Sequence, residues 1–167
     1  DPIGGPLAGT RGPVPVFRAP TADLAPAERA FLAAVESLGI PFARDLNATA
    51  DQSPCVGPAP KNIADGVRMN GAFTYLAPVR SRPNLEVTPD TLVNHVVIEQ
   101  GKAAGVVTAD GRTFAAREVI LSAGAYGSPA ILLRSGIGPS DHLRELGIPV
   151  RADLPGVGEH LLDHPLC

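Results

Sequence analysis

The residues with the clearest chemical potential form a glycine-rich turn in the second half of the chain. Residues 118–122 read EVILS, an apolar run that predicts a strand buried on both faces, and the small-residue stretch 123–127, AGAYG, follows it. Ser128-Pro129 then opens a predicted helix to about Arg134, with Ser128 as the N-cap. Such a turn lets backbone N–H groups approach a ligand, and α/β sheets bind nucleotides at this kind of position. An ordinary strand–helix turn explains the same spacing, and no GxGxxG loop follows a predicted strand.

Histidines and nucleophiles give weaker signals. His160 and His164 are four residues apart, so one helical face would present two imidazoles to a metal ion. The segment is not HExxH and spacing places no third ligand, so capping or surface roles are favoured and no metal site is predicted. No GxSxG nucleophile elbow occurs, and Cys55 reads as a loop residue without a catalytic role. We therefore predict no catalytic residue within this chain.

A small set of helices and strands must position the glycine turn. Apolar residues at helical spacing predict a helix over 25–38, with Pro26 in its first turn and Gly39 after its end. Residues 91–116 predict a three-stranded antiparallel meander, with turns at residues 100–102 and at Asp110-Gly111. In the first half we also expect a loop over 1–20 with a short edge strand at 14–16, an irregular chain over 41–66 and a short helix in 70–80. In the second half we expect a short helix capped by Ser140, an extended segment at 148–154 and a last helical turn after 158.

Composition limits the class of protein. The chain has 167 residues, 44% of them hydrophobic, and a net charge of -3, so no strong field favours nucleic acid. No run of 18 apolar residues predicts a membrane span. Two cysteines are too few for a disulfide scaffold, which favours a reducing, cytoplasmic location. Abundant Ala, Gly, Pro and Arg suggest a bacterial source, and both ends suggest a piece of a longer protein.

The stretch 118–139, EVILSAGAYGSPAILLRSGIGP, closely resembles the second sequence signature of the glucose–methanol–choline (GMC) oxidoreductases, a family of flavoenzymes. Upstream, TRGPVPVFR, YLAPVRSRPNLEV and TLVNHVVIEQGKAAGVV resemble family segments in the same order. Downstream, LGIPVRADLPGVGEHLLDHP resembles a stretch ending in a VGxNLQDH-like motif, with His160 for the usual Asn and Leu162 for the usual Gln. The resemblance extends over essentially the whole chain.

The resemblance implies a mixed α/β (α+β) fold that combines parts of two domains. Residues 1–84 would belong to a substrate-binding domain, 85–157 to an FAD-binding domain with the antiparallel meander and a parallel strand, and 158–167 to a second substrate-domain segment. It also implies three cofactor-binding positions. The backbone of Val93 would bond the adenine, and Ala123-Gly124 would lie near the adenosine part of FAD.

Family members place a GxGxxG loop near their start and a catalytic His near their end, and neither motif is present here. The chain is therefore expected to be a central fragment, inactive and without retained FAD when isolated, and His160 and His164 are not assigned the catalytic role. The intact parent would oxidise a small alcohol to a carbonyl by hydride transfer to flavin, with an unknown electron acceptor. Leu166 stands where choline-oxidising members commonly place a Glu, which disfavours choline.

Two alternatives stay open. A hydroxynitrile lyase can be built on the same fold, and the chain can be a stand-alone binding or structural module. A stand-alone module predicts a closed core. A piece of a larger enzyme predicts exposed apolar edges at 118–122 and around 149–152, left by missing sheet partners.

Overall fold

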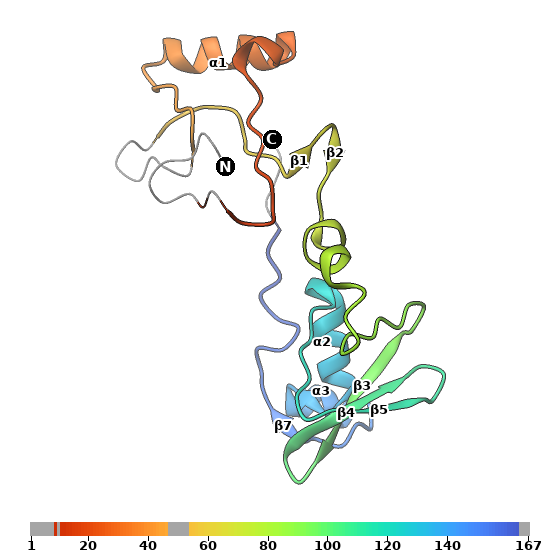
Figure 1. The fold of residues 1–167 in the computed structure, drawn as a ribbon. Helices are drawn as coiled ribbons and strands as arrows, with labels where there is room; N and C mark the ends of the chain where they lie inside the picture. The colour runs from red at the N-terminus through yellow and green to blue at the C-terminus, as the bar shows by residue number, and fades with distance from the viewer. Residues whose placement is uncertain (1–8, 10, 47–53, 164–167) are drawn as a thin grey trace. The chain divides into compact units, whose positions relative to one another are not determined.

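The computed structural model describes residues 9, 11–46 and 54–163, shown as a ribbon in Figure 1. The chain divides into two compact units, Asp1–Glu86 and Val87–Cys167. The assignment of these units to substrate-binding and FAD-binding domains stays a prediction. Among the described residues no helix is long and apolar enough to cross a membrane.

Helix α1, Pro26–Ser37, is the main element of the first unit and confirms the helix predicted over 25–38. Pro26 occupies the first turn, where its missing N–H costs nothing. The Glu28 carboxylate accepts a hydrogen bond of 2.8 Å from the Ala25 N–H, which caps the helix start. Leu32 is the buried residue of the helix, and Gly39 follows its end with a φ of 82°.

The rest of the first unit is built from short elements, among them the 3-10 helix Thr21–Asp23. A two-residue turn at Asp65-Gly66, with φ values of 49° and 75°, joins β1, Ile63–Ala64, to β2, Val67–Arg68. The prediction that 41–66 is wholly irregular was therefore wrong at its end. Phe17 pairs with Lys61 as an isolated bridge, in place of the edge strand expected at 14–16. The expected helix in 70–80 is a π-turn followed by a 3-10 turn, over Ala72–Leu76 and Ala77–Val79.

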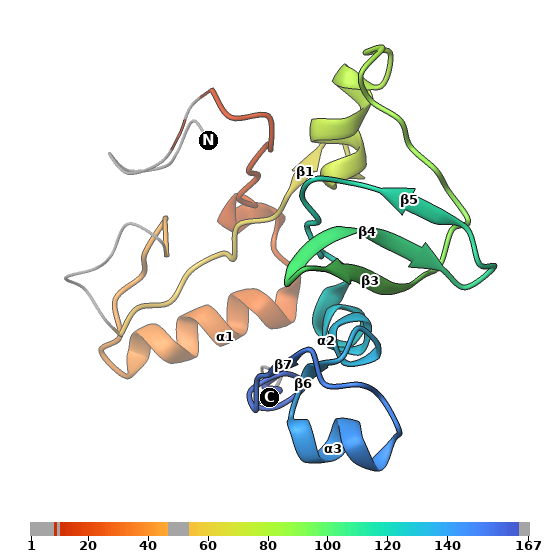
Figure 2. The same cartoon turned by 90° about the horizontal axis from the view of Figure 1, so that it is seen from below.

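The second unit contains the antiparallel meander that the sequence predicts. Its strands are β3, Val93–Glu99, β4, Lys102–Thr108, and β5, Thr113–Ala115, in the order β3-β4-β5. Gln100-Gly101 forms a two-residue turn with both φ values positive, shorter than expected. Figure 2 shows helix α2, Gly124–Arg134, lying alongside β3.

Helix α2 begins five residues earlier than predicted, and Ser128 is not its N-cap. Ser128 lies inside the helix. Its Oγ accepts a hydrogen bond of 3.0 Å from the N–H of Ala123, the residue that precedes the helix. Pro129 also lies inside the helix instead of at its first position. The positive φ of Gly124, 81°, explains the early start, because glycine allows the chain to turn sharply before the first helical turn.

Beyond α2 the chain forms a small parallel pair that encloses a third helix. Strand β6, Ile137–Gly138, pairs with β7, Ala152–Asp153, and α3, Ser140–Glu145, lies between them in sequence. Leu143 of α3 is fully buried. The Asp153 carboxylate accepts a hydrogen bond of 3.0 Å from the Ser140 N–H, so a side chain of β7 caps the start of α3. The prediction that the Ser140 side chain caps this helix was wrong.

Two further sequence predictions fail in this unit. Residues 118–122 form no strand and pair with none in the described part of the chain. A strand buried on both faces needs ladder partners, and here Ile120 is 81% exposed instead. The helical turn expected after residue 158 is absent from the described residues 159–163, where His160 has a φ of 58°. His164, Leu166 and Cys167 lie outside the described residues.

Candidate functional site

The candidate site is a groove of about 590 Å³ in the second unit. One wall is the chain entering β3, and the other is the unpaired stretch that precedes α2. Its lining is residues 91–93 and 119–123 together with Val106, Gly127, Ile131 and Arg134. These walls are mostly aliphatic, and Arg134 supplies the one charged side chain of the described lining. The groove therefore suits a ligand with a flat apolar face, held by backbone groups at its edges.

The structure brings together two of the three residues predicted to bind a cofactor. Val93 and Ala123 are 30 positions apart in sequence, and both line the groove. Val93 is half-buried at the start of β3, whereas Ala123 is exposed just before α2. Gly124 follows Ala123 and is exposed, but it is not among the lining residues. The spacing of these residues in the sequence did not indicate that Val93 lies near Ala123 and Gly124.

Gly124 has a backbone reason to be glycine, but no packing reason within the described chain. Its φ of 81° lies in the left-handed region, which L side chains rarely adopt. A methyl group placed on its Cα would meet no atom within 4 Å beyond its chain neighbours and the nearby backbone of its own helix. The backbone at this turn therefore faces open space, where a ligand or another part of a longer protein can reach it.

Gly136 and Gly138, in the same signature, have the opposite surroundings. A methyl group on Gly136 would overlap the Pro149 carbonyl oxygen, and one on Gly138 would overlap the Leu133 side chain. Both glycines are buried. The structure therefore supports a packing role for them.

Sequence analysis missed the part played by Arg134 and Ser135 at the end of α2. Arg134 donates to the Asn94 carbonyl at 2.7 Å and to the Val93 carbonyl at 3.4 Å. The buried Ser135 hydroxyl accepts the Val96 N–H at 2.8 Å. These bonds join residues about 40 positions apart, so no local spacing indicates them.

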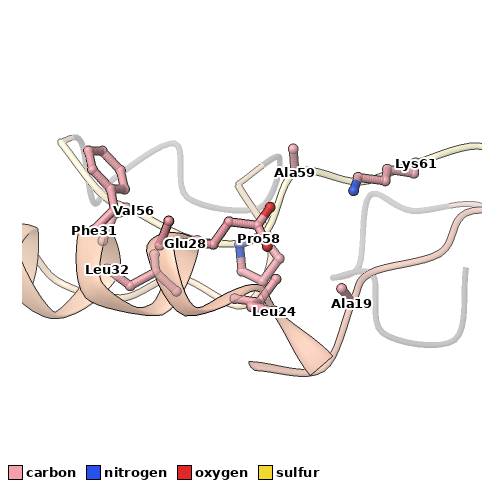
Figure 3. Close-up of a pocket in the computed structure, with 11 residues that line it drawn as sticks. Ala19, Leu24, Glu28, Phe31, Leu32, Val56, Pro58, Ala59 and Lys61 are labelled. Atoms are coloured by element: carbon pink, nitrogen blue, oxygen red, sulfur yellow. The ribbon is translucent and has the colours of Figure 1, made fainter. Parts of the chain in front are cut away.

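Figure 3 shows a separate hollow of about 350 Å³ within the first unit, between α1 and residues 56–61. Leu24, Phe31 and Leu32 form much of its apolar wall. Glu28 and Lys61 also line it, but the Glu28 carboxylate is held by the helix cap. No predicted site residue lies in this hollow.

The described residues do not bring three His, Cys, Asp or Glu side chains together as a metal site would require. His160 is exposed, and no helix presents it. The pairing with His164 that the sequence analysis weighed falls partly outside the described residues.

Comparison with known proteins decides the family. The model of the family described as GMC oxidoreductase matches residues 9–166, which is nearly the whole chain. The chain belongs to the GMC oxidoreductase family. The resemblance of the 118–139 signature is thereby confirmed, and GMC family members are FAD-dependent enzymes.

Several GMC relatives are similar to this chain in sequence. Mitochondrial choline dehydrogenase of Mus musculus is 42% identical over 160 residues, covering 93% of this chain and 26% of the relative. The 5-(hydroxymethyl)furfural oxidase of Methylovorus sp. is 41% identical over 163 residues, covering 95% of this chain and 30% of the relative. The chain thus spans between a quarter and a third of the length of these relatives.

Solved structures support the same conclusion. Pyridoxine 4-oxidase from Mesorbium loti superposes with a TM-score of 0.75 at 33% identity, over 88% of this chain and 29% of that one. An FAD-dependent oxidoreductase from Chaetomium thermophilum gives a TM-score of 0.76 at 32% identity, over 92% and 27% of the two chains. The small mixed α/β fold, with antiparallel and parallel sheets, therefore matches part of the GMC flavoenzymes.

Proposed function

We propose that this chain acts as part of a longer FAD-dependent GMC oxidoreductase that oxidises a small alcohol to a carbonyl compound. Within that enzyme, its groove would hold the adenosine part of FAD. The observation that carries the proposal is the convergence of Val93 and Ala123 on one apolar groove, beside the open backbone at Gly124.

The residues present fit this part of the cofactor. Aliphatic side chains of the groove offer a dry surface to the flat face of an adenine. Gly124 leaves space above its Cα, so a ligand can approach the backbone closely. The exposed residues 123–124 lie at the start of α2, where backbone N–H groups favour an anionic group.

Each residue then has a limited task. The Val93 backbone would form polar contacts with the adenine edge, and the 123–124 turn would accept the neighbouring ribose and phosphate. FAD, when bound, supplies the acceptor for the hydride that leaves the alcohol. The chain itself positions the cofactor and excludes water from it, and the group that takes the alcohol proton would lie outside this chain.

The unpaired stretch at 118–122, with its exposed Ile120, supports a role within a longer protein over a stand-alone module. Ile120, at 81% exposed, shows the uncovered edge expected of a chain that lacks its sheet partners. The substrate stays at the level of a small alcohol. Relatives named as choline dehydrogenase, 5-(hydroxymethyl)furfural oxidase and pyridoxine 4-oxidase differ widely in the alcohol.

A titration of the isotopically labelled chain tests the cofactor role. Adding ADP should shift the backbone amide signals of Val93, Ala123 and Gly124 in the NMR spectrum. FMN, which lacks the adenosine part, is the matched control and should leave these signals in place. FAD should be lost when the chain is passed through a desalting column.

Amide shifts confined to other regions, or equal shifts with ADP and FMN, would contradict the proposed groove. Tightly retained FAD would show that the chain holds more of the cofactor site than we propose. Alcohol turnover by the chain alone would show that a catalytic group lies within it.

A further inference from the structure

Strand β3 needs partners on its outer edge. Within the described part of the chain, β3 pairs with β4 on one side only. The Val96 N–H would be left unpaired in a buried position, but the Ser135 Oγ accepts it at 2.8 Å. The same hydroxyl donates to the Ile131 carbonyl at 2.6 Å, so it is fixed in place by its own helix. The end of α2 therefore holds the edge of β3.

The strand is irregular where it enters the groove. Val93 pairs with Thr108 and His95 with Val107, so Asn94 is an extra residue on the β3 side. Successive carbonyls of a regular strand point to opposite edges, and one side chain cannot bond both in the strand plane. At this bulge the Arg134 guanidinium reaches both neighbours, the Asn94 oxygen at 2.7 Å and the Val93 oxygen at 3.4 Å.

We propose that Arg134 is a positioning residue that fixes the β3 bulge and so sets the direction of the Val93 backbone groups in the groove. This inference rests on the proposed function, because it assumes that the Val93 backbone meets the adenine. The Asn94 bond is the shorter one, and it anchors the extra residue of the bulge. The longer bond to the Val93 oxygen leaves the second lone pair of that carbonyl available to a ligand.

The arginine fork is suited to this task. Its donors lie in one plane and can span two carbonyl oxygens, whereas a lysine ammonium is a single point. Arg134 is exposed, so water competes for its donors and the effect should be moderate. Ser135 is buried beside it and would keep α2 docked on β3 when Arg134 is replaced. An Arg134 variant should therefore keep the fold and change the bulge.

The experiment compares Arg134→Met and Arg134→Lys with the control Arg144→Met. Arg144 is an exposed arginine on α3 whose bonds go to Ser140 and Asp141, away from the bulge. Each labelled chain is titrated with adenosine and with ADP, and the amide signals of residues 93–96 and 123–124 are followed. Amide hydrogen exchange at residues 93–96 is measured without ligand.

We expect Arg134→Met to speed exchange at the bulge amides and to weaken adenosine binding about fivefold, with Arg134→Lys between Met and the wild type. The control should match the wild type in both measurements. Adenosine lacks phosphate, so a loss seen with ADP but not with adenosine would mean direct phosphate contact and would overturn the positioning role. Unchanged exchange and unchanged affinity in Arg134→Met would overturn it as well, while leaving the proposed function standing. If the wild type itself bound neither ligand at the groove, the proposed function and this inference would both fall.

Discussion

The two halves of the 118–143 region differ in whether packing within the second unit accounts for their residue types. In the first half, Ile120 is exposed and Gly124 faces open space. In the second half, Ile131 and Leu143 are buried, and Gly136 sits against the Pro149 carbonyl. Residue types in the second half follow from packing inside the unit. Packing inside the unit does not explain Ile120 and Gly124 in the first half, which is expected where a chain is shaped to meet a cofactor or further protein.

The glycines give the largest expected difference between the halves. Gly136→Ala combines a φ of 78° with overlap on a carbonyl oxygen, so we expect a loss of about 4 kcal/mol in the stability of the second unit. Gly124→Ala has a similar φ of 81° but open space around it, so we expect about 1 kcal/mol. Native-state hydrogen exchange at the β3 and β4 amides measures both.

The comparison would fail if the two alanine variants were equally destabilised. ADP titration of the same variants sharpens it. Gly124→Ala should disturb binding more than its small stability loss explains, because the added methyl group projects into the space left for the ligand.

A pair of isoleucines gives the next effect in size. Ile131 is 6% exposed in α2 and Ile120 is 81% exposed in the unpaired stretch. Truncation of the buried residue, Ile131→Ala, should cost about 3 kcal/mol through lost contacts and a cavity. The matched change Ile120→Ala should cost less than about 0.5 kcal/mol.

Hydrogen exchange of the second unit again measures both isoleucine variants. A large loss for Ile120→Ala would mean that 118–122 packs against this unit after all. It would remove the contrast between the two halves of the region.

The sequence predicted those features of the fold that depend on local signals. The Asp110-Gly111 turn and helix α1 were predicted because their signals are local: a positive-φ glycine, a proline in the first turn and regular apolar spacing. The strand predicted at 118–122 was wrong because no strand of the described chain pairs with this stretch. An apolar run is a local signal and does not show whether a pairing strand is present.

Contacts between distant residues were also beyond sequence reasoning. Asp153 caps α3 in place of the predicted Ser140, because a side chain from β7 reaches the helix start. Val93 and Ala123 were predicted to share a ligand only through the family resemblance, and their place in one groove required the fold. The Arg134 bonds to β3 had no sequence signal at all.

The smallest expected effect is a pH dependence of stability at the turn that joins β4 and β5. A hydrogen bond from the Thr108 hydroxyl, aided by bonds and charge from Arg112, lowers the pKa of Asp110 below its ordinary value of 3.8. A carboxyl whose pKa is depressed by folding adds stability above its unfolded pKa and loses it as pH falls through the folded pKa. The stability that this carboxylate adds should therefore decline as pH falls from the ordinary Asp pKa of 3.8 through the lowered folded pKa.

An NMR titration of the Asp110 carboxyl measures this shift. Thr108→Val removes the largest cause while keeping the side-chain shape, so the pKa should rise toward its ordinary value and the acid-dependent loss of stability should become smaller. Asp110→Asn should remove this part of the pH dependence altogether. Since every group that acts on Asp110 lies within residues 108–112, the titration should be the same with and without ADP in the groove. A shift of this pKa on ADP binding would show that the meander and the groove are coupled. The β4–β5 turn would then respond to the ligand, which would contradict the view that residues 108–112 alone determine the pKa of Asp110.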